Sequence, residues 1–267
     1  MTHNSFNIDN MRLAVLIDAE NVPRNCIKSV MEEIAIYGTP TIKRIYGDWT
    51  SPMIAGWKGS LLENAITPIQ QYSYTTGKNS SDSAMIIDAM DILYTEKTDG
   101  FVIVSSDSDF TRLAIRLREA GQRVIGIGER KTPSAFIAAC DKFTYIEVIH
   151  ESNEEARSES EESDQKTPAQ PRSKRRQISR TPSVKVPDDV VQLIADSVAA
   201  LAGDSGAVFM GELGNLILKK QPDFDHRNFG YMSLSSMVKS IDRFETEFRQ
   251  TTDPNIKHVF VRDKEAT

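Results

Sequence analysis

The sequence predicts two folded domains, an α/β domain built on an open, doubly wound parallel sheet and a small winged helix-turn-helix domain. Short apolar runs alternate with helical stretches through the first 150 residues, which is typical of a parallel sheet covered by helices. A highly charged segment with few apolar residues then interrupts the chain. After it, three helical patterns precede two stretches of alternating apolar residues.

Composition and charge exclude several classes of protein. The 267 residues are 39% hydrophobic, which is enough for real cores. The net charge of −6 argues against a general nucleic-acid coat protein. Two cysteines, Cys26 and Cys140, are too few for a disulfide scaffold or a cysteine zinc site, and we expect buried free thiols in a reducing compartment. The polar first ten residues resemble no signal sequence, and no apolar run reaches the ~18 residues of a membrane span, so we expect a cytoplasmic protein without membrane contact.

The elements of the first domain follow from the apolar runs. Continuous apolar runs indicate strands that are covered on both faces. We expect strands at residues 12–17, 42–46, 67–72, 101–104 and 124–127, with 145–148 as a candidate sixth strand. Helices are expected at 23–37, where Pro23 lies near the start, at 81–94, and at 110–120, where Gly121 follows as a C-cap.

A charged linker separates the two domains. Residues 151–164 carry seven acids against one base, and residues 165–185 carry seven bases and no acid. We predict that 151–185 is disordered, because it has too little apolar surface to offset its ordering entropy. The basic half is either a nucleic-acid-binding arm or part of a solvated tether. The second domain then spans 186–264, with helices from 187, at 210–220 and at 234–241, and a hairpin of 244–248 with 258–262.

Four carboxylates are expected at one end of the predicted sheet. Asp18 follows the first strand, Asp107 and Asp109 follow the strand at 101–104, and Asp82 opens a helix after a polar loop. Ligands of such sheets bind at the carboxyl ends of the strands. Converging acids repel one another, and a hard cation such as Mg²⁺ or Mn²⁺ removes that cost and can activate water against a phosphodiester. Each acid taken singly could instead cap a helix, with Asp109 a candidate N-cap and Asp82 a partner of the helix dipole.

Four segments carry a resemblance to a known family. They are Val15–Asn21, Arg44–Trp49, Gly77–Asp82 and Val104–Phe110, and together they resemble the NYN domain of the PIN-like nuclease superfamily, in its LabA-like branch, over residues 11–150. The resemblance implies a PIN-like sheet of order 3-2-1-4-5 and a metal site at Asp18, Asp82, Asp107 and Asp109. Asn21 matches the asparagine of the family's first motif.

Several further residues of this domain are candidates for contact with substrate. We expect Asn21, Lys78 and Ser106 to lie near the substrate, with Lys78 next to the predicted metal site. Ser105 and Ser106 are expected to bond the backbone at the strand end, and one of them could instead orient a metal-bound water. Weaker candidates for phosphates are Lys43 and Arg44. The aromatic side chains either stack bases or pack in the core: Trp49, Trp57, Tyr72 and Tyr74.

The C-terminal domain resembles a second family. Its segments Gly211–Asn215, Pro222–Asp225, Phe229–Tyr231 and 234–238 resemble the OST-HTH/LOTUS domain. The resemblance implies RNA binding or, in some members, protein binding. The 13 acids and 9 bases of residues 186–267 argue against a broad phosphate-binding face. A local basic patch, or ordinary surface charge, is the open choice for Lys219, Lys220, Arg227 and Lys239.

These features predict a metal-dependent ribonuclease whose C-terminal module binds RNA, single-stranded or structured, with Mg²⁺ or Mn²⁺ as cofactor. The four acids would be both catalytic residues and metal ligands. A non-catalytic RNA-binding or regulatory adaptor is the alternative. A metal-dependent phosphatase is less favoured, since the segment Asp18–Glu20 lacks the second aspartate of an aspartyl-phosphate motif.

Overall fold

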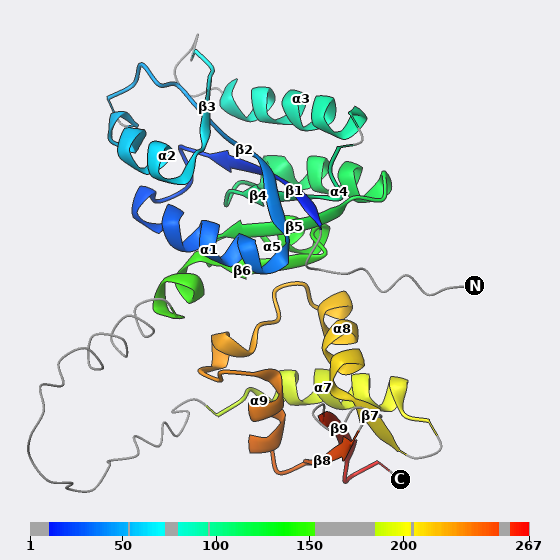
Figure 1. Ribbon diagram of the computed structural model, residues 1–267. Helices are drawn as coiled ribbons and strands as arrows, with labels where there is room; N and C mark the ends of the chain where they lie inside the picture. Colours follow the sequence, from blue (N-terminus) through cyan, green and yellow to red (C-terminus); the bar gives the residue numbers. More distant parts are fainter. Residues whose placement is uncertain are drawn as a thin grey trace, which may run out of the picture. The chain divides into compact units, whose positions relative to one another are not determined.

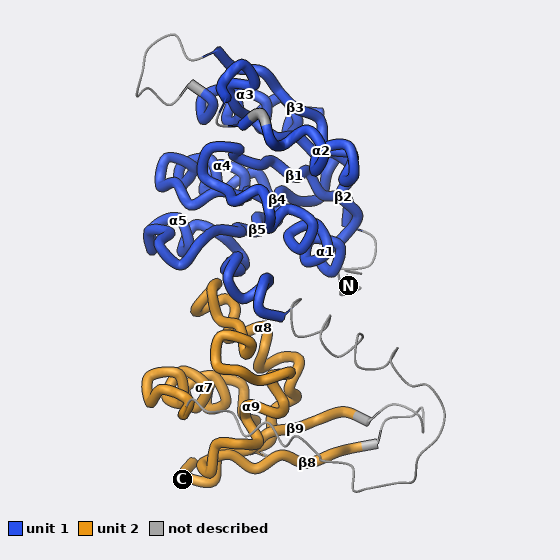
Figure 2. The backbone as a smooth tube through the Cα atoms, turned by 90° about the vertical axis from the view of Figure 1, so that its left-hand side faces the viewer, with its two compact units in different colours: residues 1–154 blue, residues 155–267 orange. Residues whose placement is uncertain are grey.

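The computed structural model describes residues 11–52, 54–72, 80–95, 97–152, 185–203, 206–250 and 257–266. The chain forms two compact units, residues 1–154 and 155–267 (Figure 2). Most of the expected linker at 151–185 lies outside the described residues, as do Lys78 and Tyr74. Within the described parts of the chain, every helix is too short or too polar to cross a membrane.

The first unit contains the predicted parallel sheet. Its strands are β1 (Arg12–Asp18), β2 (Thr39–Gly47), β3 (Thr67–Gln70), β4 (Gly100–Val104), β5 (Arg123–Gly128) and β6 (Lys142–Tyr145). All neighbouring pairs are parallel, and the order is β3-β2-β1-β4-β5-β6. The PIN-like order 3-2-1-4-5 is confirmed, and β6 extends it. The expected sixth strand at 145–148 is wrong, because the strand ends at Tyr145 and residues 146–152 are helical.

Helices cover both faces of this sheet (Figure 1). On one face lie α1 (Ile27–Tyr37) and α2 (Lys58–Asn64), and on the other lie α3 (Ser80–Tyr94), α4 (Thr111–Glu119) and α5 (Ser134–Ala139). Strand β1 shows why. Val15 packs on the side of α1 with Val30, whereas Leu16 packs on the side of α3 with Met85. Alternate residues of a strand point to opposite faces, so a fully apolar run is buried on both.

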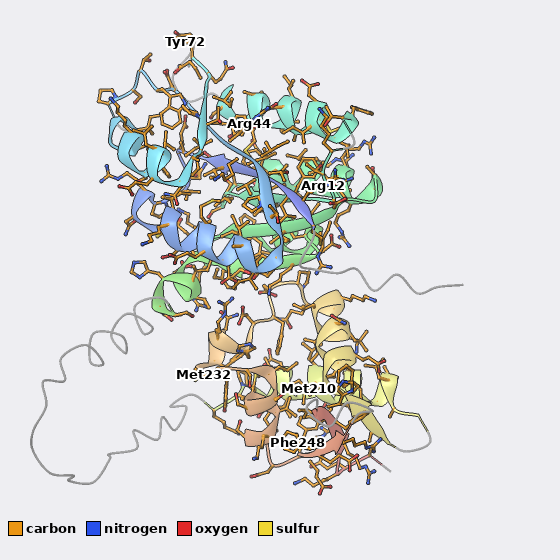
Figure 3. The ribbon with its side chains drawn as sticks, viewed as in Figure 1. Arg12, Arg44, Tyr72, Met210, Met232 and Phe248 are labelled. Carbon is orange, nitrogen blue, oxygen red and sulfur yellow. The ribbon has the colours of Figure 1, made fainter. Side chains whose placement is uncertain are left out.

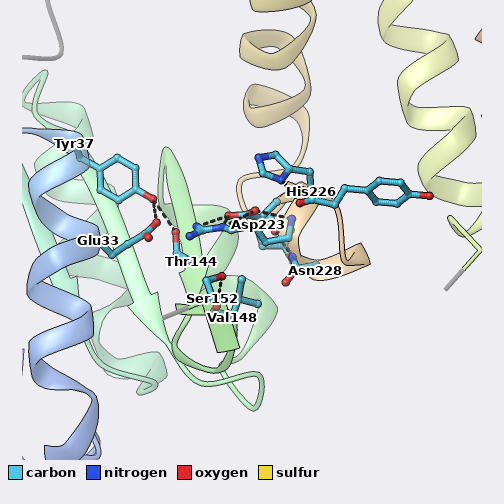
Figure 4. Close-up of polar contacts among 11 residues, drawn as sticks. Glu33, Tyr37, Thr144, Val148, Ser152, Asp223, His226 and Asn228 are labelled. Atoms are coloured by element: carbon cyan, nitrogen blue, oxygen red, sulfur yellow. Dashed lines mark hydrogen bonds and ion pairs between the residues drawn. The ribbon is translucent and has the colours of Figure 1, made fainter. Parts of the chain in front are cut away.

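Polar contacts fasten some helices to the sheet. The Tyr37 hydroxyl, at the end of α1, contacts the buried Glu33 carboxylate and lies 3.3 Å from Thr144 Oγ1 of β6 (Figure 4). On the far side, Asp88 of α3 accepts hydrogen bonds from Arg44 and from the Tyr46 hydroxyl of β2. Both contacts give a carboxylate a hydrogen-bond donor where a helix meets the sheet.

The second unit has the expected three helices and hairpin. Its elements are α7 (Asp188–Leu201), β7 (Ala207–Phe209), α8 (Met210–Lys220), a 3-10 turn (His226–Phe229), α9 (Leu234–Ser240), β8 (Phe244–Gln250) and β9 (Lys257–Asp263). The antiparallel sheet has the order β7-β9-β8. Its core joins the helices to the sheet through fully buried side chains such as Ile194, Leu213, Met237 and Val261. The short strand β7 was not among the expected elements.

Candidate metal centre

Three of the four predicted acids come together at the carboxyl end of the sheet. Asp107 and Asp109 follow β4, and Asp82 lies in the first turn of α3. One carboxylate oxygen from each residue lies within 4.8 Å of the others. Asp82 is buried, Asp107 is half-buried and Asp109 is exposed. We call these three residues the acid group, and its graded burial leaves one side open to solvent.

The turn after β4 places the two later acids. Asp107 Oδ1 accepts a hydrogen bond of 2.9 Å from the Asp109 backbone N–H, which caps the 3-10 turn Ser108–Phe110. Phe110 is fully buried and anchors this turn against the core. The capping residue is therefore Asp107, and the alternative in which Asp109 is the N-cap of the helix is wrong.

Asp18 lies beside the acid group but belongs to a different arrangement. Its side chain is 2% exposed, and each of its oxygens accepts two hydrogen bonds. Oδ1 accepts from the backbone N–H groups of Glu20 and Asn21 at 3.0 and 3.3 Å. Oδ2 accepts from Asn21 Nδ2 at 2.7 Å and from Ser105 Oγ at 2.9 Å. The structure thus places the Asn21 amide on Asp18.

Ser105 connects Asp18 to the acid group. While its hydroxyl donates to Asp18, it accepts a 3.1 Å hydrogen bond from the Asp107 backbone N–H. The next residue, Ser106, is buried and its Oγ accepts from the Glu129 backbone N–H at 2.9 Å, joining the ends of β4 and β5. Both serines therefore shape the rim of the sheet.

Glu20 was not among the predicted site residues. Its carboxylate lies 3.4 Å from Ser81 Oγ, next to Asp82, and it contributes to the negative field there. The signal was present in the sequence, since Glu20 is two residues after Asp18 at the same strand end. Ser105 does bond the backbone at the end of β4, as expected, and its contact with the Asp18 carboxylate was not foreseen.

Burial and charge both act on Asp82. Burial is the largest cause that raises the pKa of its carboxyl group to about 7, and the negative charges of Asp18, Asp107, Asp109 and Glu20 add to it. A divalent cation held by the acid group would reverse this effect. The donor set fits Mg²⁺ or Mn²⁺, because it offers only carboxylate oxygens and both cysteines are buried free thiols.

The weaker candidates have mostly structural contacts. Arg44 pairs with Asp88, and Lys43 Nζ donates to the Asn64 carbonyl at 2.6 Å. Trp57 is buried at 3% exposure, and Trp49 Nε1 donates to the Ile69 carbonyl at 2.9 Å, so both tryptophans pack rather than stack. Tyr72, by contrast, is 55% exposed just beyond β3 (Figure 3).

Fold and site together define a PIN-like α/β protein with a carboxylate cluster at the strand ends. The NYN domain family model matches residues 12–147, and the OST-HTH/LOTUS domain model matches residues 183–256. The chain therefore belongs to the NYN domain family and carries an OST-HTH/LOTUS domain after it.

Two solved structures resemble parts of the chain. One is a protein of unknown function, VPA0982, from Vibrio parahaemolyticus RIMD 2210633, with 19% identity, a TM-score of 0.44, and coverage of 55% of this chain and 96% of that one. The other is an uncharacterized protein from gene locus NE0665 of Nitrosomonas europaea, with 30% identity, a TM-score of 0.28, and coverage of 36% and 95%. No curated protein matches the chain.

Proposed function

We propose that this protein is a metal-dependent ribonuclease in which the NYN domain hydrolyses RNA phosphodiesters and the OST-HTH/LOTUS domain binds RNA. The observation that carries the proposal is the acid group, with three carboxylates within 4.8 Å at the strand ends of an NYN domain. The OST-HTH/LOTUS match supports the RNA-binding part.

Each acid has its own part in this proposal. Asp82, Asp107 and Asp109 hold Mg²⁺ or Mn²⁺, which supplies an activated water and offsets charge on the phosphodiester. Asp18 is the fourth acid of the site. Because its oxygens are occupied by Asn21, Ser105 and backbone donors, it acts on the cation through its charge and positions Asp107 through Ser105.

The proposed contacts with substrate are less direct. Asn21 and Ser106 shape the strand ends around the acid group, since their side chains bind Asp18 and the Glu129 backbone N–H. Lys78 precedes Asp82 by four residues in the chain and is the proposed contact for a phosphate. The open side of the acid group, next to the exposed Asp109, is where a phosphodiester would enter.

The test is a cleavage assay on labelled single-stranded and structured RNAs with Mn²⁺, Mg²⁺ or EDTA. We expect cleavage that needs the metal and is lost in Asp82→Asn and in Asp107→Asn. Asp91→Asn is the matched control, because Asp91 is an exposed acid on the same helix α3. If the wild type binds RNA but never cleaves it, the protein is an adaptor and the nuclease proposal is wrong. Hydrolysis of a chromogenic phosphomonoester in preference to RNA would indicate a phosphatase.

A further inference from the structure

An aromatic row lies on the outer face of the sheet of the second unit. In β9, Val259 and Val261 face the core, so the alternate residues His258 and Phe260 lie on the opposite face. Phe209 of β7 pairs in register with Phe260. We define the aromatic row as Phe209, His258 and Phe260.

The rings of this row lie against one another without entering the core. The Phe209 ring centroid is 4.8 Å from that of His258 and 5.9 Å from that of Phe260. All three residues are half-buried, and none belongs to the buried core of the second unit. Figure 2 shows β8 and β9 running side by side, with α7, α8 and α9 in the same unit.

An arginine adds to the aromatic row. Arg249 of β8 pairs in register with His258, and its guanidinium carbon lies 4.3 Å from the Phe260 ring centroid. Its neighbour on the same face, Glu247, forms an ion pair with it. This face therefore carries three aromatic rings, with the guanidinium over one side of the Phe260 ring, while the valines of the sheet lie on the inner face.

We propose that the aromatic row is a stacking surface for unpaired RNA bases. The inference rests on the proposed RNA function and specifies the surface and the mode of binding. Every base has a flat face that stacks on an aromatic ring, so such a surface binds single strands with little sequence preference. The rings and the Arg249 guanidinium are planar groups, and unpaired bases stack on both.

Stacking, rather than phosphate contact, dominates in this proposal. Residues 186–267 have 13 acids and 9 bases, and Arg249 already has Glu247 as a counter-charge. Few counterions are then released when RNA binds. For binding at this surface alone, we expect the logarithm of the affinity to fall with the logarithm of salt concentration with a slope of only about −1 to −2.

The experiment measures RNA affinity of the full chain in EDTA, so that cleavage does not interfere. The probe is a fluorescein-labelled adenine homopolymer of about twelve nucleotides, read by anisotropy. We expect the double variant His258→Thr, Phe260→Thr to bind at least about tenfold more weakly. Phe248→Thr is the matched control. Phe248 is 67% exposed in β8 and pairs in register with Val259, which places it on the inner-face side of the sheet.

A second variant distinguishes loss of the stacking surface from loss of folding in the double variant. Phe260→Trp is expected to keep the affinity, and its indole emission should be quenched by RNA, measured against the wild type. Trp49 and Trp57 both belong to the first unit and supply the background. Affinity unchanged in the double variant, or no quenching in Phe260→Trp, would overturn the stacking surface, as would equal affinity for a duplex.

Failure of this inference and failure of the proposed function give different results. Binding that depends on the aromatic row, in a protein that never cleaves RNA, supports the stacking surface and refutes the nuclease. Metal-dependent cleavage with binding that ignores the aromatic row refutes the stacking surface alone. If both hold, the double variant raises KM for RNA and leaves kcat unchanged.

Discussion

Replacing Asp82 with asparagine should stabilise the metal-free protein at neutral and higher pH. The folded state raises the pKa of this carboxyl group from an ordinary 3.8 to about 7, chiefly by burial. Between these values the folded chain binds a proton that the unfolded chain has lost, so wild-type stability falls as pH rises through this window. Above about pH 7 the full cost of a buried charge beside other acids is present, and asparagine removes it.

The magnitude follows from the shift. The pKa of Asp82 rises by about three units, and at ~1.4 kcal/mol for each unit the cost of the buried charge is at most ~4 kcal/mol. Solvent and salt reach the open side of the acid group, where Asp109 is exposed, and we expect screening to leave about half of this energy. The Asp82 carboxylate also interacts favourably with the dipole at the N-terminus of α3, and losing this interaction reduces the gain by ~0.5–1 kcal/mol. A net gain of ~1 kcal/mol in the free energy of unfolding is expected at about pH 8.

Urea unfolding in EDTA, followed by tryptophan fluorescence, measures this change. The chain has two tryptophans, Trp49 and Trp57, and both pack against the core of the first unit, so the signal reports on the NYN domain alone. The gain should shrink as the pH is lowered toward 4. Asp91→Asn, on the exposed side of α3, should show no such dependence.

Manganese should reverse the order of stability. At about a hundred times its dissociation constant, Mn²⁺ stabilises the wild type by ~2.7 kcal/mol, while Asp82→Asn gains little. If the variant is less stable than the wild type in EDTA at about pH 8, or if the difference between them ignores pH, the Asp82 carboxylate is not a destabilising buried charge and the reasoning is refuted.

Three other substitutions test the hydrogen bonds and packing contacts that hold the site and the sheet in place. Ser105→Ala removes the hydroxyl between Asp18 and Asp107, and titration calorimetry should show Mn²⁺ affinity lowered about tenfold, with Ser108→Ala as an unchanged control. Asp88→Asn leaves the Arg44 guanidinium without its ion pair and should cost ~1–3 kcal/mol by tryptophan fluorescence, against no change in Asp91→Asn. Gly126→Ala puts a Cβ 2.5 Å from the Phe143 ring and should destabilise by ~1–3 kcal/mol, whereas Gly59→Ala, with open space in α2, should stabilise slightly; equal effects would contradict this packing.

Most of the sheet could be predicted because its strands are buried on both faces. Runs such as 12–17 and 101–104 leave no room for a helical period, and their burial patterns are nearly continuous. The edge of the sheet was harder. Lys142–Tyr145 is a four-residue strand followed at once by a helix, and its apolar content continues into that helix, so the pattern at 145–148 indicated a strand three residues too late.

Short helices and strands were not predicted, for a related reason. Strand β7 has three residues, and α2 and α5 have seven and six, too few for a period to be distinguished. They form because neighbours complete them: Val208 of β7 is 2% exposed against Val261, its partner in β9. Such tertiary support leaves no trace in a local pattern.

The acid group was predictable in its residues but not in its internal order. Strand-end position identifies Asp18, Asp107 and Asp109 as neighbours, since parallel strands end at one edge, and Asp82 opens the helix that comes after β3. It cannot tell which carboxylates face solvent. Asp18 sits at the end of the central strand β1, where the turn of Glu20 and Asn21 folds back and offers donors to both oxygens. Asp107 and Asp109, in a turn that leaves the sheet, keep an open side.

Ser105 lies between the hydrogen-bonded Asp18 and the turn that carries Asp107 and Asp109. The Ser105 hydroxyl donates to the Asp18 carboxylate and accepts from the Asp107 backbone N–H, so one oxygen atom links Asp18 to the turn that carries Asp107 and Asp109. Asp18 is buried, and four hydrogen bonds hold its carboxyl group in place. The negative charge of Asp18 is among those that raise the pKa of Asp82, and a cation would relieve this repulsion. Metal binding and local stability are therefore opposed at Asp82, where the substitution that removes a proposed metal ligand should increase the stability of the metal-free protein.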